Sequence, residues 1–80
     1  MPTVYQQEGF AFRIFPADHE PPHVHVWKAG AKLKVGLGSG SRGLYLMSNQ
    51  GMSPREARRA VIIAEANQQE LLAAWKRYHA

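Results

Sequence analysis

Hydrophobic residues occupy alternate positions through much of the first half of the chain. The period of two is clearest over residues 10–15, 23–27 and 32–37, where most apolar side chains are separated by Ala, Arg, His or Lys. A strand points successive side chains to opposite faces, so this period is typical of strands with one buried face. The pattern therefore predicts a sheet with an apolar inner face and an outer face that carries basic and imidazole groups.

Turn-forming residues separate these segments and suggest how the strands pair. Residues 3–5 precede a Gln-Gln-Glu-Gly turn and are expected to form a hairpin with 10–15. The turn at 28–31 is expected to join the second hairpin, and residues 44–46 are expected to add a short edge strand. We predict a small antiparallel sheet of three to four strands.

The second half of the chain has a helical period. Ser53 is suited to the N-cap, with Pro54 at the first helical position and Glu56 three residues after the cap. Beyond this start, apolar residues recur at spacings of three and four: Ala57, Ala60, Val61, Ala64, Leu71, Leu72, Trp75 and Tyr78. This stripe predicts one long C-terminal helix, or two short helices that meet near Asn67, a second plausible cap.

These elements predict an α+β fold in a single domain over residues 1–80, with 1–47 mainly β and 53–79 helical. A chain of this length buries only about 60 to 65% of its unfolded surface, so its core must be thin. Ile62 and Ile63 lie off the apolar stripe and make the middle of the helix apolar on every side. We expect a homodimer to cover Ile62 and Ile63, since a twofold dimer is the commonest solution for such a surface.

The amino-acid composition limits the kinds of site and partner that this chain can have. The chain has no cysteine, which excludes disulfides, thiolate nucleophiles and Cys-based metal centres. A net charge of +4 favours acidic partners, among them RNA or DNA. No apolar run approaches the ~20 residues that span a bilayer, and no basic region followed by an apolar stretch opens the chain. We expect a cytoplasmic protein without a membrane partner.

The most unusual segment runs from Asp18 to Trp27 and holds three of the four histidines and two of the six acids. If 23–27 is a strand, Val24 and Val26 face the core and both imidazoles, His23 and His25, are solvent-accessible on the opposite face. His79, near the C-terminus, is expected to be incidental.

Three uses of this histidine block remain open. His23 and His25 could be the acid and base of a metal-independent ribonuclease, because two imidazoles can shuttle protons at a ribose hydroxyl. The block could equally be a non-catalytic surface for nucleic acid or protein, or a polar turn that ties the loop to the sheet. Residues expected to contribute to binding are Asp18, His19, Glu20, Arg13, Lys32 and Lys34.

The sequence does not predict a metal site, although two histidines could contribute to one. Two histidines two residues apart on a strand can converge on one ion, but a structural or catalytic site needs at least a third ligand, which would have to come from Asp18, His19, Glu20 or elsewhere. An extended Pro21-Pro22 spacer would place His19 on the order of 12 Å from His23. We therefore expect no metal and no other cofactor.

Four stretches together resemble the small bacterial DUF4160 family, a domain of unknown function. They are Met1-Pro2-Thr3-Val4, the block from Asp18 to Val26, the helix entry Gly51-x-Ser53, and Asn67-x-x-Glu70-Leu71-Leu72-x-x-Trp75. The resemblance implies one member of a toxin-antitoxin-like or regulatory pair, with a cognate small partner protein, but it brings no known reaction. The chain departs from the family pattern in the stretch from Gly36 to Gly43, which is rich in Gly and Ser.

Overall fold

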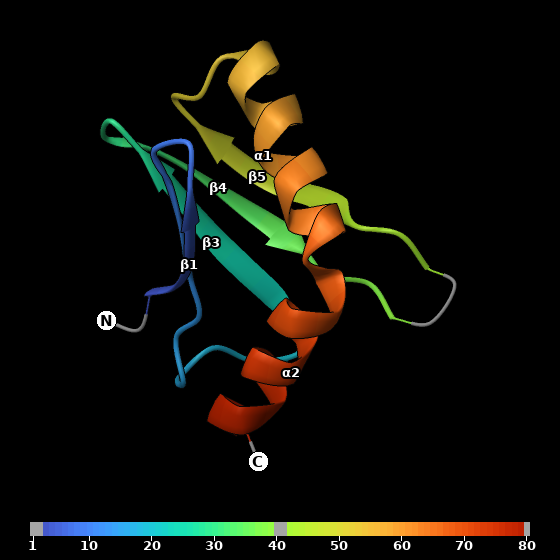
Figure 1. The fold of residues 1–80 in the computed structure, drawn as a ribbon. Coiled ribbons are helices and arrows are strands. Elements are labelled where there is room, and N and C mark those ends of the chain that lie inside the picture. The colour runs from blue at the N-terminus through green and yellow to red at the C-terminus, as the bar shows by residue number, and fades with distance from the viewer. Residues whose placement is uncertain (1–2, 40–41, 80) are drawn as a thin grey trace.

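The chain folds as a five-stranded antiparallel sheet with two helices on one of its faces (Figure 1). The computed structural model describes residues 3–39 and 42–79. The strands lie side by side in chain order: β1 (Thr3–Gln7), β2 (Phe10–Arg13), β3 (His23–Lys28), β4 (Ala31–Gly36) and β5 (Tyr45–Gln50). The helices are α1 (Pro54–Ala66) and α2 (Gln68–His79). The α+β class is confirmed, and of the two predicted helical arrangements the structure has two short helices that meet at Asn67. The predicted three to four strands are wrong, because the sheet has five.

Both predicted hairpins are present. β1 pairs with β2 and β3 pairs with β4, each antiparallel. The two turns use a residue pair with positive φ, Glu8-Gly9 and Ala29-Gly30. Positive φ at both central residues matches the turn to the twist of the flanking strands. The edge strand is longer than predicted, because β5 continues through polar residues that pair with β4 but show no hydrophobic period.

The helical segment breaks at Asn67. The N-cap prediction holds, since the backbone N–H of Glu56 donates to Ser53 Oγ at 3.1 Å. At the break, Asn67 has non-helical dihedral angles, and its side chain donates to the carbonyl of Ile63 at 2.8 Å. Asparagine side chains compete in this way for backbone groups, which makes them favourable at helix ends. The change of direction lets the apolar sides of both helices face the sheet.

The core lies between the helices and the inner face of the sheet. Eight of its nine largest fully buried side chains come from the alternating positions of the first half of the chain, and the ninth is Leu71 of α2. The eight are Phe10, Phe12, Ile14, Val24, Val26, Leu33, Val35 and Leu37. Ile63 joins this core at 2% exposure, whereas Ile62 is 47% exposed. The prediction that both isoleucines need an outside cover is therefore wrong for Ile63. Neither α1 nor α2, nor any other helix within the described ranges, is long and apolar enough to cross a membrane.

Candidate functional site

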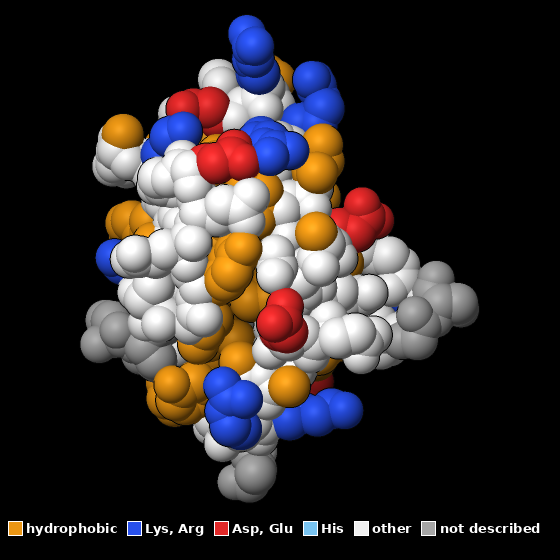
Figure 2. Space-filling model, in the orientation of Figure 1, with side chains coloured by type: hydrophobic (Ala, Val, Ile, Leu, Met, Phe, Trp, Pro, Cys, Tyr) orange, Lys and Arg blue, Asp and Glu red, His pale blue; other side chains and the backbone are white. Residues whose placement is uncertain are grey.

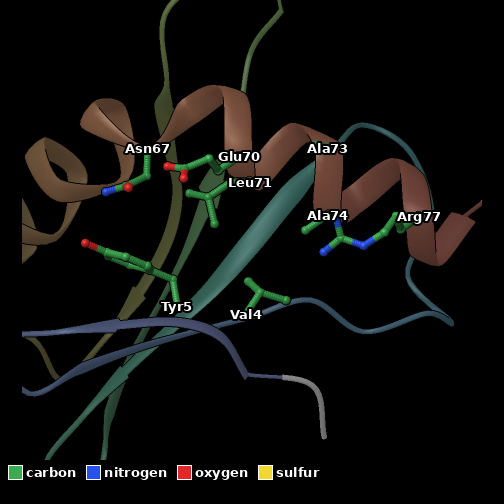
Figure 3. A pocket seen from close by; sticks show the side chains of 8 residues that line it. All are labelled: Val4, Tyr5, Asn67, Glu70, Leu71, Ala73, Ala74 and Arg77. Carbon is green, nitrogen blue, oxygen red and sulfur yellow. The ribbon is translucent and has the colours of Figure 1, made fainter.

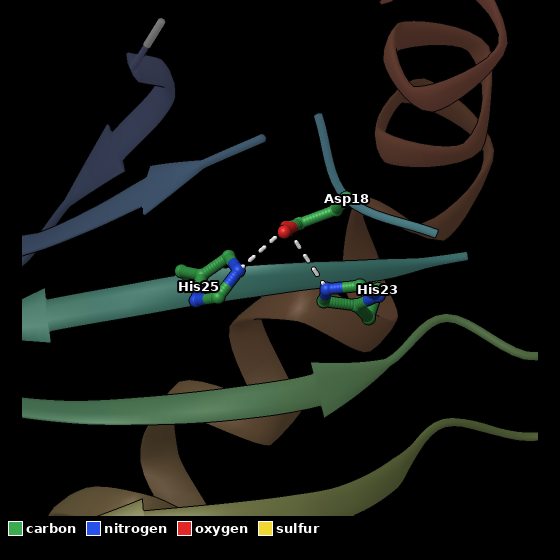
Figure 4. Close-up of side chains that lie close together, drawn as sticks. All are labelled: Asp18, His23 and His25. Carbon is green, nitrogen blue, oxygen red and sulfur yellow. Dashed lines mark hydrogen bonds and ion pairs between the residues drawn. The ribbon is translucent and has the colours of Figure 1, made fainter. Parts of the chain in front are cut away.

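The loop between β2 and β3 brings Asp18 onto two histidines of β3 (Figure 4). Asp18 Oδ2 lies 3.0 Å from His23 Nε2 and 2.8 Å from His25 Nε2. A turn positions the acid, because the backbone N–H of Asp18 donates to the carbonyl of Phe15 at 3.0 Å. The structure thus joins three predicted site residues, Asp18, His23 and His25, through one carboxylate oxygen. We call these three residues the Asp-His-His cluster.

The other ring nitrogen of His23 determines what its Nε2 can do. His23 Nδ1 lies 2.8 Å from the carbonyl of Pro21, which can only accept a hydrogen bond. The proton of a neutral His23 therefore sits on Nδ1, and Nε2 presents a lone pair to the Asp18 carboxylate. That contact is favourable only if a positive charge, either a proton or a metal ion, lies on the Asp18 side of the ring.

His23 is buried, at 5% exposure, which contradicts the prediction that both imidazoles are solvent-accessible. The predicted burial of Val24 and Val26 is confirmed. The cause is tertiary: α2 passes the end of β3 where His23 lies (Figure 1), and the Trp75 ring packs 5.2 Å from the His23 ring. The strand period alone could not show this, because the cover comes from a helix more than fifty residues away.

At both Asp18 and His25, burial shifts the pKa in one direction and the hydrogen-bonded partner shifts it in the other. Burial raises the pKa of Asp18, but hydrogen bonds and charge from His25 and His23 together hold it below its ordinary value. For His25, burial outweighs the attraction of Asp18 and lowers the pKa. His25 also lies edge-on to the Phe15 ring at 4.6 Å. Neutral imidazole, the form that binds metals, is thus favoured at His25.

His79 supports the site from the end of α2, contrary to the expectation that it is incidental. Its ring stacks on Trp75 at 3.6 Å between centroids. Nδ1 lies 2.8 Å from the carbonyl of Trp75, and Nε2 lies 3.0 Å from the carbonyl of Asp18. The i, i+4 spacing of Trp75 and His79 on a helix was visible in the sequence, but the contact with Asp18 was not.

The three-ligand argument against a metal fails on geometry. Candidate ligand atoms of Asp18, His23 and His25 all lie within 4.8 Å of one another. Of the third ligands considered from the sequence, the structure brings in Asp18, whereas His19 and Glu20 are exposed and outside this cluster. The arrangement also disfavours His23 and His25 as a ribonuclease pair, because both Nε2 atoms face the same oxygen and His23 is buried.

The face of the sheet opposite the helices carries the predicted basic residues. Arg13, His25, Lys34 and Ser48 are aligned across β2 to β5, and the neighbouring row is Ala11, Trp27, Lys32 and Gln50. Trp27 lies between two cations: Arg13 Cζ is 5.4 Å and Lys32 Nζ is 5.0 Å from its ring centroid. None of the six acids lies on a strand. We call this surface the open face. The Asp-His-His cluster adjoins it, because His25 belongs to the face and lies 2.8 Å from Asp18 Oδ2.

Two cavities lie on opposite sides of the sheet. One, of about 190 Å³, is on the open face and is lined by His25, Lys32, Lys34, Ser48 and their neighbours. The other, of about 300 Å³, lies between β1 and α2 and is lined mostly by apolar side chains such as Val4 and Leu71 (Figure 3). Hydrophobic side chains form a band on this helix-bearing side of the molecule (Figure 2). Only the open-face cavity adjoins the Asp-His-His cluster.

Comparison with models of known protein families identifies the family of this chain. The family model described as a domain of unknown function (DUF4160) matches residues 9–76, which include every strand after β1, all of α1 and the first three quarters of α2. The chain belongs to the DUF4160 family. No curated protein and no solved structure matches this DUF4160 chain. Its chemistry must therefore be argued from the open face and the Asp-His-His cluster.

Proposed function

We propose that this DUF4160 protein binds single-stranded nucleic acid on the open face of its sheet. The observation that supports this most directly is the gathering of three cations on a face whose strands carry no acid: Arg13 and Lys32 lie over the Trp27 ring, and Lys34 pairs with His25 in the neighbouring row. Cations that follow a phosphate backbone supply most of the affinity of such proteins, and their binding weakens steeply with salt.

Aromatic side chains on the same face suit a single strand better than a duplex. Trp27 is partly exposed, and the ring of Tyr45 lies over Gly36 at the far end of β4. Bases stack on such rings without sequence preference, and each stacked base contributes about 1–3 kcal/mol. In addition, Arg13 Nε and Trp27 Nε1 are donors with no acceptor among the described residues. Both atoms are buried in the unbound chain, so a change of side-chain rotamer on binding would be required to offer either N–H to a phosphate or base oxygen.

This role would suit the toxin-antitoxin-like or regulatory pair that the family resemblance implies, in which a partner protein could cover or release the open face. A ribonuclease that uses His23 and His25 is the alternative function. It predicts cleavage of RNA in the presence of a chelator, and loss of that cleavage in His25→Ala.

The test is fluorescence anisotropy with labelled single-stranded RNA and DNA of mixed sequence at several salt concentrations. Lys32→Ala combined with Lys34→Ala removes two cations from the open face. The slope of log affinity against log salt is negative, and each phosphate contact on a single strand adds about 0.7 to its magnitude. If each of the two cations contacts one phosphate, the slope should become shallower by about 1.4 in the double variant. Affinity should fall for all sequences alike, because phosphate contacts carry no sequence information.

The matched control is Arg55→Ala combined with Arg58→Ala. Both arginines are exposed on α1, on the other side of the sheet, so this variant has the same net charge as the first. It should keep nearly the full affinity and slope. Equal losses in the two variants would show that binding follows net charge and not the open face, and would refute the proposal, as would absence of binding at low salt.

A further inference from the structure

We propose that Asp18, His23 and His25 bind one divalent first-row transition-metal ion, of which Zn²⁺ is the representative, and leave one coordination position open toward the open face. This inference goes beyond nucleic-acid binding and does not depend on it. Two imidazoles and one carboxylate form a ligand set used for zinc and for non-haem iron. In catalytic zinc sites, three protein ligands leave the fourth position for water or substrate.

The ligand atoms are already close to the positions that an ion requires. A tetrahedral ion about 2.0–2.2 Å from each ligand separates the ligands by roughly 3.4 Å. Here Asp18 Oδ2 is 3.0 Å from one nitrogen and 2.8 Å from the other, and all candidate ligand atoms lie within 4.8 Å. The two separations from Asp18 Oδ2 differ from the required spacing by about an ångström at most, a distance that rotations of the partly exposed Asp18 and His25 side chains can cover.

The ring orientation of His23 gives independent support. With Nδ1–H donated to the carbonyl of Pro21, Nε2 points at a carboxylate oxygen, and this contact is favourable when a proton or a metal ion lies between the two atoms. A metal ion in that place bonds to both atoms. The same Nδ1–H to carbonyl contact is the usual way in which proteins orient a ligating histidine.

The surroundings hold the ligands in place. Trp75 covers one side of His23, and His79 binds the backbone carbonyl of Asp18, so α2 supports two of the three ligands. The side chains of Asp18 and His25 keep 28% and 18% exposure, compared with 7% for His23. Solvent therefore reaches the site from the side of Asp18 and His25. That side adjoins the cavity lined by His25, Lys32 and Lys34, where an anionic ligand could approach the open position.

The test uses the full chain without a histidine tag, at tens of micromolar, dialysed against Zn²⁺ and separately titrated with Co²⁺. We expect one ion per chain by elemental analysis, and visible Co²⁺ absorption bands typical of a low-coordinate N/O site. Asp18→Asn and His25→Ala should each lower affinity by at least ~100-fold, more than the 10–100-fold typical of losing a supporting group. Both side chains are partly exposed, at 28% and 18%, and circular dichroism checks that both variants fold.

His19→Ala is the matched control, because it removes an exposed histidine of the same loop that lies outside the Asp-His-His cluster. It should retain full affinity and the same Co²⁺ spectrum. Binding that survives in Asp18→Asn and His25→Ala, or that is lost equally in His19→Ala, would place the ion elsewhere and overturn the proposal. A folded wild-type chain that binds neither ion would overturn it too, and would identify the cluster as a hydrogen-bonded imidazolium. Neither result bears on RNA or DNA binding measured in chelator, so the two proposals fail separately.

Discussion

A single residue at the end of α2 links the two halves of the site. His79 contacts the carbonyls of Trp75 and Asp18, so it connects the last helical turn to the loop that carries the carboxylate. It touches neither the imidazole of His23 nor that of His25 through a hydrogen bond of its own. His79 is thus a positioning residue, whose effect on the Asp-His-His cluster passes through the backbone of Asp18.

His79→Ala should lower the free energy of unfolding by about 1–2 kcal/mol, because the ring N–H that donates to one of the two carbonyls is lost, at roughly 0.5–1.5 kcal/mol, together with the stacking contact with Trp75. Urea denaturation measures this change. The NMR amide signal of Asp18 should shift and broaden as the loop is released. Lys76→Ala, an exposed change on the same helical turn, should alter neither quantity. If the two substitutions behave alike, His79 does not hold the loop.

Among the elements, β4 and β5 depend on Gly36, which the sequence pattern marks only as the start of a stretch rich in Gly and Ser. A Cβ added to Gly36 would overlap the ring of Tyr45, which pairs with Gly36 across the two strands. The ring occupies the space that a side chain would fill on the open face. The close approach of Tyr45 thus requires glycine at this position, although glycine within a strand usually weakens it.

Gly36→Ala should destabilise the protein by about 1–3 kcal/mol, as overpacking does elsewhere. In a Tyr45→Ala background the same substitution should cost much less, because the ring is gone. Urea denaturation of the four proteins gives the coupling free energy directly. Gly43→Ala is the control, since no atom lies within 4 Å of its added Cβ. Additive effects of Gly36→Ala and Tyr45→Ala would contradict the packing argument.

At the scale of the whole molecule, contacts between distant segments join the helices to the sheet. Arg59 of α1 donates through two nitrogens to the carboxylate of Glu8 in the β1–β2 turn, and these bonds lower the pKa of Glu8 to about 2. Gln68 of α2 donates to the carbonyl of Leu37 after β4, at 2.7 Å. Ile63 fills the core between these two attachments, while Ile62 points away from it.

Of the two isoleucines that the homodimer was predicted to cover, only Ile62 is therefore exposed and open to a second subunit. Ile62→Glu should leave the monomer fold intact and, if the wild-type chain dimerises as expected, should give a monomer in sedimentation at tens of micromolar. Ile63→Glu should unfold the chain, because it buries an unpaired charge. Circular dichroism distinguishes the two variants. A wild-type chain that sediments as a monomer at this concentration would rule out the dimer.

The sequence by itself determined the elements that depend on neighbouring residues. The alternation in β2, β3 and β4, the two hairpin turns and the Ser53 cap are all local, since strand period, turn chemistry and capping each act over a few residues. The sequence also showed where to look for chemistry, because three histidines within the segment from Asp18 to Trp27 are unusual. It could not choose between one helix and two at Asn67, since both keep the same apolar spacing.

Only the tertiary structure decided how these elements meet. The register across β2 to β5 aligns Arg13, His25 and Lys34, which are far apart in the chain. The path of α2 buries His23 and places His79 on Asp18. The fold of the loop makes Asp18, and not His19, the partner of the two imidazoles. Each of these depends on the direction of a distant segment, and the period of a strand or helix carries no information about that direction.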